Sequence, residues 1–300
     1  MVEQRHAGYA VVAIVLIGLV LLATFSTPTL DSAESEWGEV TDRTSEIRTE
    51  LVVTNSNFYP IPPVVTLQYD VSFNDIVVAT GQRGGVGLSR GESSIGTAAT
   101  MDNAQVAPWW RSHVERGEQT TTVVDPVASV PPIPITVGLP AQRTTIETDF
   151  AASLSRETVG PPVTFGEGDR VVLDDLSASW GEPTDARTPL VVSLTFRNRH
   201  DEPVVVENLR YRIGLNEIDV GAGPIEDDVT VPANGSETVD LTLAVENDRM
   251  SVWWPTHLRN DEQTRVVVEL AGATRLVGTD DRSEFDVPIQ NTTLETDTFG

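Results

Sequence analysis

The sequence predicts a mainly β protein: two tandem antiparallel β-sandwiches of the immunoglobulin or fibronectin-III type, each with one short helix, after an N-terminal transmembrane helix. Three observations predict this class. They are an uncharged apolar run near the N-terminus, a duplication of nearly all the remaining chain, and an alternation of apolar and polar residues inside each copy. Three hundred residues suffice for two ordinary domains, and the hydrophobic content of 39% suffices for packed cores.

The apolar run comprises residues 7–25 and contains no charged side chain. A helix of this length spans about 28 Å, which is close to the ~30 Å core of a bilayer. Arg5 precedes the run and acidic residues follow it, so the positive-inside rule predicts that residues 1–6 are cytoplasmic. A cleaved signal peptide is the alternative, although its apolar region is about 7–15 residues long. We therefore expect a single-pass protein of the cell membrane with its C-terminal domains outside the cell.

A duplication organises the rest of the chain. Segments recur 142 to 148 residues later with the same residue types in the same order, and all six tryptophans fall in matched pairs. A period of this length indicates two globular domains rather than a solenoid, whose units are about 20–50 residues long. The matched segments are Trp37–Asp42 with Trp180–Asp185, residues 67–76 with 209–218, residues 109–120 with 253–264, and residues 144–149 with 292–297.

The duplication also predicts the domain boundaries. The first sandwich is expected at residues 31–152 and the second at residues 169–300. Between them, residues 153–168 are expected to form a linker, because they contain the breakers Pro161-Pro162 and Gly166-Glu167-Gly168.

The strands are predicted from a period of two. Apolar side chains alternate with polar ones, and asparagine or glycine follows where a turn is needed. The strand segments are residues 47–54, 67–73 and 76–79 in the first copy and residues 190–197, 209–215, 239–245 and 266–270 in the second.

One segment of each copy has a helical period instead. Apolar residues at i, i+3, i+4, i+7 and i+8 form one face of a short amphipathic helix. The positions are Val106, Trp109, Trp110, His113 and Val114 in the first copy and Met250, Trp253, Trp254, His257 and Leu258 in the second.

The turn and strand pattern resembles a known family. An alternating strand, Asn-x-Asn, Tyr-Pro, and a hairpin reading Asn-Asp-Ile-x-x-Ala-x-Gly occur at residues 51–60 and 74–81. This arrangement is similar to the late-embryogenesis-abundant type 2 family, which contains the water stress and hypersensitive response (WHy) domain. The second copy shows the pattern at residues 196–203, 216–223 and 231–235. The family's usual Asn-Pro-Asn is Asn-Ser-Asn in the first copy and Asn-Arg-His in the second. The resemblance implies non-enzymatic sandwich domains associated with desiccation or osmotic stress, with no catalytic residues to transfer.

The composition limits which environments and which binding partners this protein can have. The chain has 20 basic residues, all arginine, and 45 acidic ones, for a formal charge of −25. This charge argues against a nucleic-acid partner, which requires a basic patch. The absence of lysine with so many carboxylates predicts a halophilic protein, since molar salt shortens the Debye length to about 3 Å. Zero cysteines exclude disulfides, thiolate metal sites and cysteine catalysis.

Few residues suggest chemistry. His113 and His257 lack the converging ligands that a metal site needs, so we interpret them as packed, hydrogen-bonded histidines. The tryptophans of the two helices either belong to the core or form a partner surface. Asn234 and Asn291 lie in Asn-x-Ser/Thr glycosylation motifs. No catalytic, cofactor-binding or metal-binding residue is predicted. The tryptophans concerned are Trp109, Trp110, Trp253 and Trp254.

The function expected from these observations is stress protection at the cell envelope by a membrane-anchored, non-enzymatic protein. The alternative is a cell-surface adhesion or scaffold module that binds an envelope protein or glycan through its loops or tryptophans.

Overall fold

The computed structural model describes residues 26–130, 133–155, 163–165 and 171–299. The predicted transmembrane segment, residues 7–25, and the predicted cytoplasmic residues 1–6 lie outside this range. Among the residues described, no helix combines the length and the apolar character that crossing a membrane requires.

The first domain is mainly β. Its strands form one antiparallel sheet with the order β1-β2-β5-β4-β3-β6-β7, and β8 pairs with β6. A 3-10 helix and one α-helix connect β5 to β6. The elements are β1 (Thr29–Val40), β2 (Thr44–Asn55), β3 (Ile61–Phe73), β4 (Ile76–Leu88), β5 (Gly91–Asp102), η1 (Asn103–Gln105), α2 (Val106–Glu115), β6 (Gln119–Val130), β7 (Ile133–Gly138) and β8 (Gln142–Glu147).

The second domain repeats this plan with two separate sheets. One has the order β15-β11-β10-β9, and the other has the order β13-β12-β16-β17 with β14 paired to β12. A four-residue helix, α3 (Phe150–Ser153), precedes it. The elements are β9 (Val163–Phe165), β10 (Val171–Trp180), β11 (Arg187–Asn198), β12 (Val204–Leu215), β13 (Ile218–Pro224), β14 (Val229–Val231), β15 (Ser236–Glu246), α4 (Asn247–Arg259), β16 (Gln263–Leu276) and β17 (Arg282–Glu295).

The difference in sheet number has a local cause. In the first domain, Ala79–Gly81 of β4 pair with residues 99–101 of β5 and join the two halves of the sheet. In the second domain, β13 ends at Pro224, and no pairing links it to β15. The two strands nevertheless pass close together. Their close approach is shown by Gly221, where an added Cβ atom would lie 2.0 Å from the carbonyl oxygen of Ala244.

The predicted turns are present. Asn74 and Asn216 have positive φ angles of 52° and 47°, which asparagine tolerates better than most residues. Asn55 Oδ1 accepts a hydrogen bond from the Asn57 backbone N–H, and Asn198 Oδ1 accepts the equivalent bond from the residue two positions later. These Asx turns close the family-like pattern in both copies.

The predicted linker differs from the structure in one respect. Val163–Phe165 falls within residues 153–168, yet it is strand β9 and pairs with Val171–Leu173 of β10. Phe165 is fully buried, so this part of the segment contributes to the core of the second domain.

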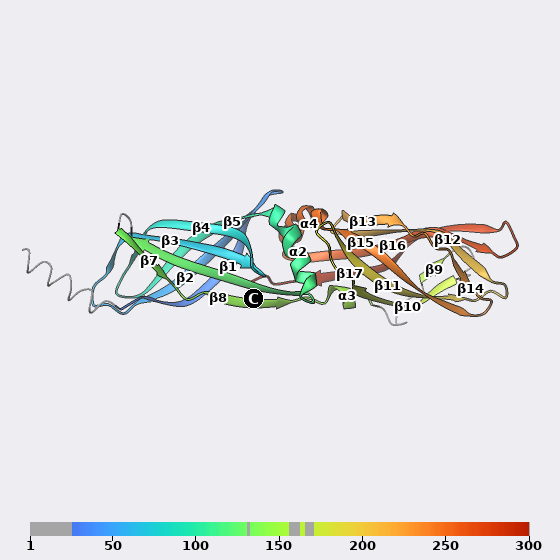
Figure 1. Cartoon of the computed structure of the whole chain (residues 1–300), viewed down its shortest axis with the longest axis horizontal. Helices are drawn as coiled ribbons and strands as arrows, with labels where there is room; N and C mark the ends of the chain where they lie inside the picture. Colours follow the sequence, from blue (N-terminus) through green and yellow to red (C-terminus); the bar gives the residue numbers. More distant parts are fainter. Residues whose placement is uncertain (1–25, 131–132, 156–162, 166–170, 300) are drawn as a thin grey trace, which may run out of the picture.

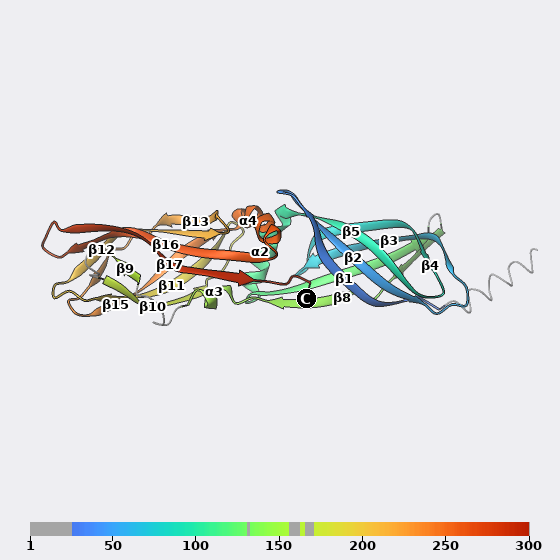
Figure 2. The same cartoon turned by 180° about the vertical axis from the view of Figure 1, so that it is seen from behind.

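The two domains lie end to end in an elongated molecule, with α2 and α4 side by side at the junction and the C-terminal end nearby (Figure 1; Figure 2). One cluster of buried hydrophobic residues continues from the first domain through both helices into the second domain. A smaller cluster, centred on Leu51, Leu67 and Leu88, lies in the first domain only. The apolar core is therefore continuous across the junction.

Candidate functional site

The helix faces predicted from the sequence meet at the junction. Every position of the predicted stripe is buried in α2 and in α4. All four helix tryptophans are at most 9% exposed, so none forms the solvent-facing partner surface considered from the sequence. The reason is that each helix packs on its own domain with one part of its face and on the other domain with the rest.

In the first domain, a hydrogen-bond chain passes through His113. Trp109 Nε1–H donates to Thr120 Oγ1 over 2.9 Å, and Thr120 Oγ1 lies 2.8 Å from His113 Nδ1. His113 Nε2 lies 2.9 Å from Thr148 Oγ1, which donates to Glu118 Oε2 over 2.9 Å. Because Thr148 Oγ1 donates its only proton to Glu118, it accepts from His113 Nε2–H, so Nδ1 is unprotonated and accepts the proton of Thr120 Oγ1.

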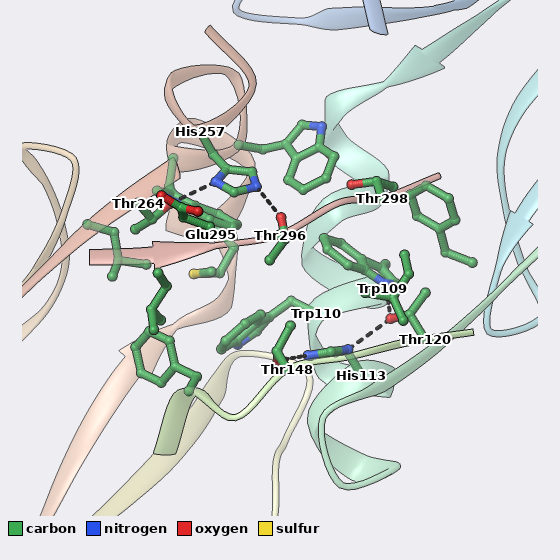
Figure 3. Close-up of a pocket in the computed structure, with 18 of the residues that line it drawn as sticks. Trp109, Trp110, His113, Thr120, Thr148, His257, Thr264, Glu295, Thr296 and Thr298 are labelled. Atoms are coloured by element: carbon green, nitrogen blue, oxygen red, sulfur yellow. Dashed lines mark hydrogen bonds between the residues drawn. The ribbon is translucent and has the colours of Figure 1, made fainter. Parts of the chain in front are cut away.

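The second domain repeats the chain residue for residue (Figure 3). Trp253 Nε1–H donates to Thr264 Oγ1 over 3.0 Å, and Thr264 Oγ1 lies 2.8 Å from His257 Nδ1. His257 Nε2 lies 2.9 Å from Thr296 Oγ1, which donates to Glu262 Oε2 over 3.3 Å.

Both histidines are held neutral. Burial lowers the pKa of His113 to about 4, although the nearby Glu118 carboxylate acts in the opposite direction. Burial likewise lowers the pKa of His257 to about 4. With both ring nitrogens engaged, each imidazole joins two threonines and has no free nitrogen for a metal or a substrate. The interpretation of these residues as packed, hydrogen-bonded histidines is confirmed.

Each hydrogen-bond chain ends on a glutamate in a left-handed turn; Glu118 is buried and Glu262 is partly buried. Glu118 and Glu262 have φ angles of 63° and 56°. Glu118 Oε1 accepts the Ala151 backbone N–H over 3.0 Å, and its Oε2 accepts that of Phe150. Glu262 Oε2 accepts the Thr298 N–H over 2.8 Å, and burial raises the pKa of the Glu262 carboxyl.

These glutamates also bind the opposite domain. Trp180 Nε1–H, at the end of β10, donates to Glu118 Oε1 over 2.7 Å. Reciprocally, Trp37 Nε1–H of β1 donates to Glu262 Oε1 over 3.1 Å. We call these two contacts the reciprocal latch. Trp37 also packs edge-on against Trp254 at 5.5 Å, and Trp180 packs in the same way against Trp110 at 5.5 Å.

Ion pairs at the edge of the junction follow the same symmetry. Arg259 of α4 donates to Asp42 Oδ1 over 2.9 Å and to the Val40 carbonyl over 3.2 Å. Arg111 of α2 pairs with Asp185, the duplicate of Asp42. Both domains thus use the same surface, as the two subunits of a twofold dimer do.

A cavity of about 210 Å³ lies at the junction between the two histidine chains. Residues of both domains line it, including all four helix tryptophans, and Glu147, Asp149 and Glu295 belong to its lining. Trp110 Nε1 and Trp254 Nε1 are buried without a hydrogen-bond partner among the described residues.

The glycosylation candidates lie elsewhere. Asn234 is exposed in the turn before β15, and Asn291 is exposed on β17, where its Oδ1 accepts a hydrogen bond from Arg265 Nε over 3.0 Å. Sequence reasoning did not assign roles to Glu118, Glu262 or the threonines. Their signal was present, because Glu-Gln-Thr recurs after each helix.

The comparisons with known proteins identify a relationship for the second copy. Residues 193–293 match the family model described as late embryogenesis abundant protein. This match supports the type 2 family and, at the level of the family, a stress-related, non-enzymatic role. No curated protein sequence matches the chain.

Three solved structures are similar. A crystal structure of a protein from Archaeoglobus fulgidus is 27% identical and covers 42% of this chain and 98% of its own, with a TM-score of 0.38. A solution structure from Arabidopsis thaliana is 10% identical and covers 41% and 85%, with a TM-score of 0.33. A putative β-galactosidase from Bacteroides fragilis is 13% identical and covers 85% and 34%, with a TM-score of 0.24.

Proposed function

We propose that this chain is a non-enzymatic stress-protection protein, anchored in the cell membrane by residues 7–25, with two late-embryogenesis-abundant type 2-like sandwich domains outside the cell. The observation that carries the proposal is the junction itself. Its glutamates and tryptophans join two acidic domains into one elongated body, and its histidines are engaged in hydrogen bonds within each domain. The charged surface of this body holds water and ions and shields neighbouring proteins from aggregation.

The alternative function, an adhesion or scaffold module, has less support, because the aromatic surface on which it depended is not exposed. The four helix tryptophans that would form an aromatic platform for a glycan or protein are buried, and Trp109, Trp110 and Trp254 contact aromatic rings of the opposite domain. The large hydrophobic side chains that are exposed are mostly scattered valines. The geometry therefore favours protection over recognition through the tryptophans.

An exposed aromatic pair close to Ser26 is consistent with the proposed anchor. Ser26, which directly follows the predicted transmembrane segment, exchanges two hydrogen bonds with Asn57, of 2.8 and 2.7 Å. Next to Asn57, Phe58 is 65% exposed and packs edge-on against Tyr59. Aromatic rings are favoured at the membrane interface, where an anchored chain would place this pair.

The proposal is tested by drying a labile reporter enzyme with residues 26–300 in molar salt. We expect less reporter aggregation with this chain than with an equally acidic, unrelated sandwich protein at the same mass concentration. If both proteins protect the reporter equally, acidity alone explains the protection, and a specific role of this chain is contradicted.

The halophilic character gives a separate prediction. Diluting the salt from molar to millimolar lengthens the Debye length from about 3 Å toward 30 Å and exposes the self-repulsion of a body with formal charge −25. We expect the Tm to fall as salt is removed, measured by circular dichroism. Sucrose at matched osmolarity is the control, and a Tm that does not depend on salt would contradict the adaptation.

A further inference from the structure

The junction cavity has the dimensions of a small-molecule site. Its volume is about 210 Å³. A dry apolar cavity of ~150 Å³ holds benzene, so this one has room for a slightly larger molecule. Its walls come from both domains, including Phe73 and the four helix tryptophans. Figure 3 labels Trp109 and Trp110 among them.

The charges around the cavity favour a cation. Three of its lining residues, Glu147, Asp149 and Glu295, are exposed acids. Among the described residues that line it, none is an arginine, and its two histidines are neutral near pH 7. An anion in the cavity would therefore lie near carboxylates, and no positively charged side chain of the lining would offset their repulsion.

The walls suit an organic cation better than a metal ion. A metal ion needs several oxygen ligands, but the hydroxyls of Thr120, Thr148, Thr264 and Thr296 are engaged in the histidine chains. Indole faces attract a cation through their quadrupole, and tryptophan does so best among the aromatic side chains. Methyl groups on the cation would bury well against these rings.

From these observations we propose that the interdomain cavity binds a small organic cation with a fully methylated ammonium group. This assignment goes beyond stress protection and does not depend on it. Because both domains form the walls, binding also favours the joined arrangement of the domains over a separated one.

The test uses the full chain in maltoside micelles at constant ionic strength. Choline is titrated by calorimetry and followed by tryptophan fluorescence, and 3,3-dimethylbutan-1-ol is the neutral probe of the same shape. We expect saturable choline binding and at least tenfold weaker binding of the neutral probe, because a desolvated cation–π contact contributes about 2 kcal/mol. Equal binding of both probes, or no binding of choline, would overturn the proposal.

Variants of the three exposed acids in the lining, which we call the mouth of the cavity, keep the test independent of folding. The triple variant Glu147→Gln, Asp149→Asn, Glu295→Gln changes only exposed side chains, and we expect it to weaken choline binding at least threefold. The matched control, with the same charge change at other exposed positions, is expected to bind choline as the unmodified chain does. Equal weakening by both variants would remove the role assigned to the mouth. The control substitutions are Glu92→Gln, Asp227→Asn and Glu237→Gln.

Discussion

The free energy of unfolding is expected to fall by about 3 kcal/mol per buried histidine as the pH is lowered from 7 to 4. Burial lowers the pKa of His113 and His257 from 6.5 to about 4. The unfolded chain therefore binds protons between these pH values that the folded chain excludes, and each pKa unit corresponds to ~1.36 kcal/mol. The stability that comes from keeping the histidines neutral is fully present above pH 6.5. It decreases as the pH is lowered toward 4 and is lost as the pH falls through 4. Urea unfolding followed by tryptophan fluorescence at several pH values measures it.

One buried group acts in the opposite direction. Burial raises the pKa of the Glu262 carboxyl, so the folded chain retains a proton there more readily than the unfolded chain does. The stability from this group grows as the pH falls, which makes the net loss smaller than the sum of the two histidine contributions.

Substitution of the two histidines tests whether they cause the loss of stability at low pH. The double variant His113→Gln, His257→Gln keeps polar side chains in both hydrogen-bond chains but cannot take up the protons. We expect it to be less stable at pH 7 and to lose most of the slope between pH 6.5 and 4. His200→Gln changes a more exposed histidine of the second domain and serves as the control, which should keep the slope. Parallel slopes in all three proteins would exclude the buried histidines as the cause.

Much of the fold was predictable because the information is local and is present twice. The alternation at residues 190–197 predicts β11, and the helical spacing of Trp109, Trp110 and His113 predicts the buried face of α2. Asparagines at the predicted turns adopt left-handed backbone or close Asx turns. Each of these features depends on a few consecutive residues and is confirmed.

The site was not predictable in the same way. A period of 3.6 shows that a helix face is buried but does not show what covers it. The sequence predicts that Trp110 belongs to the core or to a partner surface, whereas it packs against Trp180 of the other domain. The sequence pattern assigns no role to Glu118. Its partner Trp180 lies 62 residues away, so the contact follows from the domain arrangement and not from any local pattern.

Removing one carboxylate of the reciprocal latch is expected to have the second large effect. Glu118→Ala leaves Trp180 Nε1–H and the backbone N–H groups of Phe150 and Ala151 without their acceptor at a buried position. Hydrogen bonds to charged groups contribute about 1.5–3 kcal/mol each, and buried donors left unpaired cost a similar amount. We expect a loss of at least ~3 kcal/mol in the free energy of unfolding, measured by urea titration.

A double-mutant cycle shows whether this energy joins the domains. Trp180→Phe keeps an aromatic ring against Trp110 and Phe150 but removes the donor to Glu118. If the latch acts between domains, Glu118→Ala and Trp180→Phe should be coupled by about 1–3 kcal/mol, since residues that share a hydrogen bond are not additive. Small-angle X-ray scattering should also show a longer or more variable body for Glu118→Ala.

The duplication supplies an internal control for this cycle. Trp37→Phe changes the other half of the latch, whose indole donates to Glu262 instead. It should therefore be additive with Glu118→Ala within ~0.5 kcal/mol, as expected for separate sites. If Trp180→Phe were as additive with Glu118→Ala as Trp37→Phe is, the indole–carboxylate contact would carry no coupling. The junction would then depend on aromatic packing alone, and the repeated Glu-Gln-Thr would serve only the histidine chain within each domain.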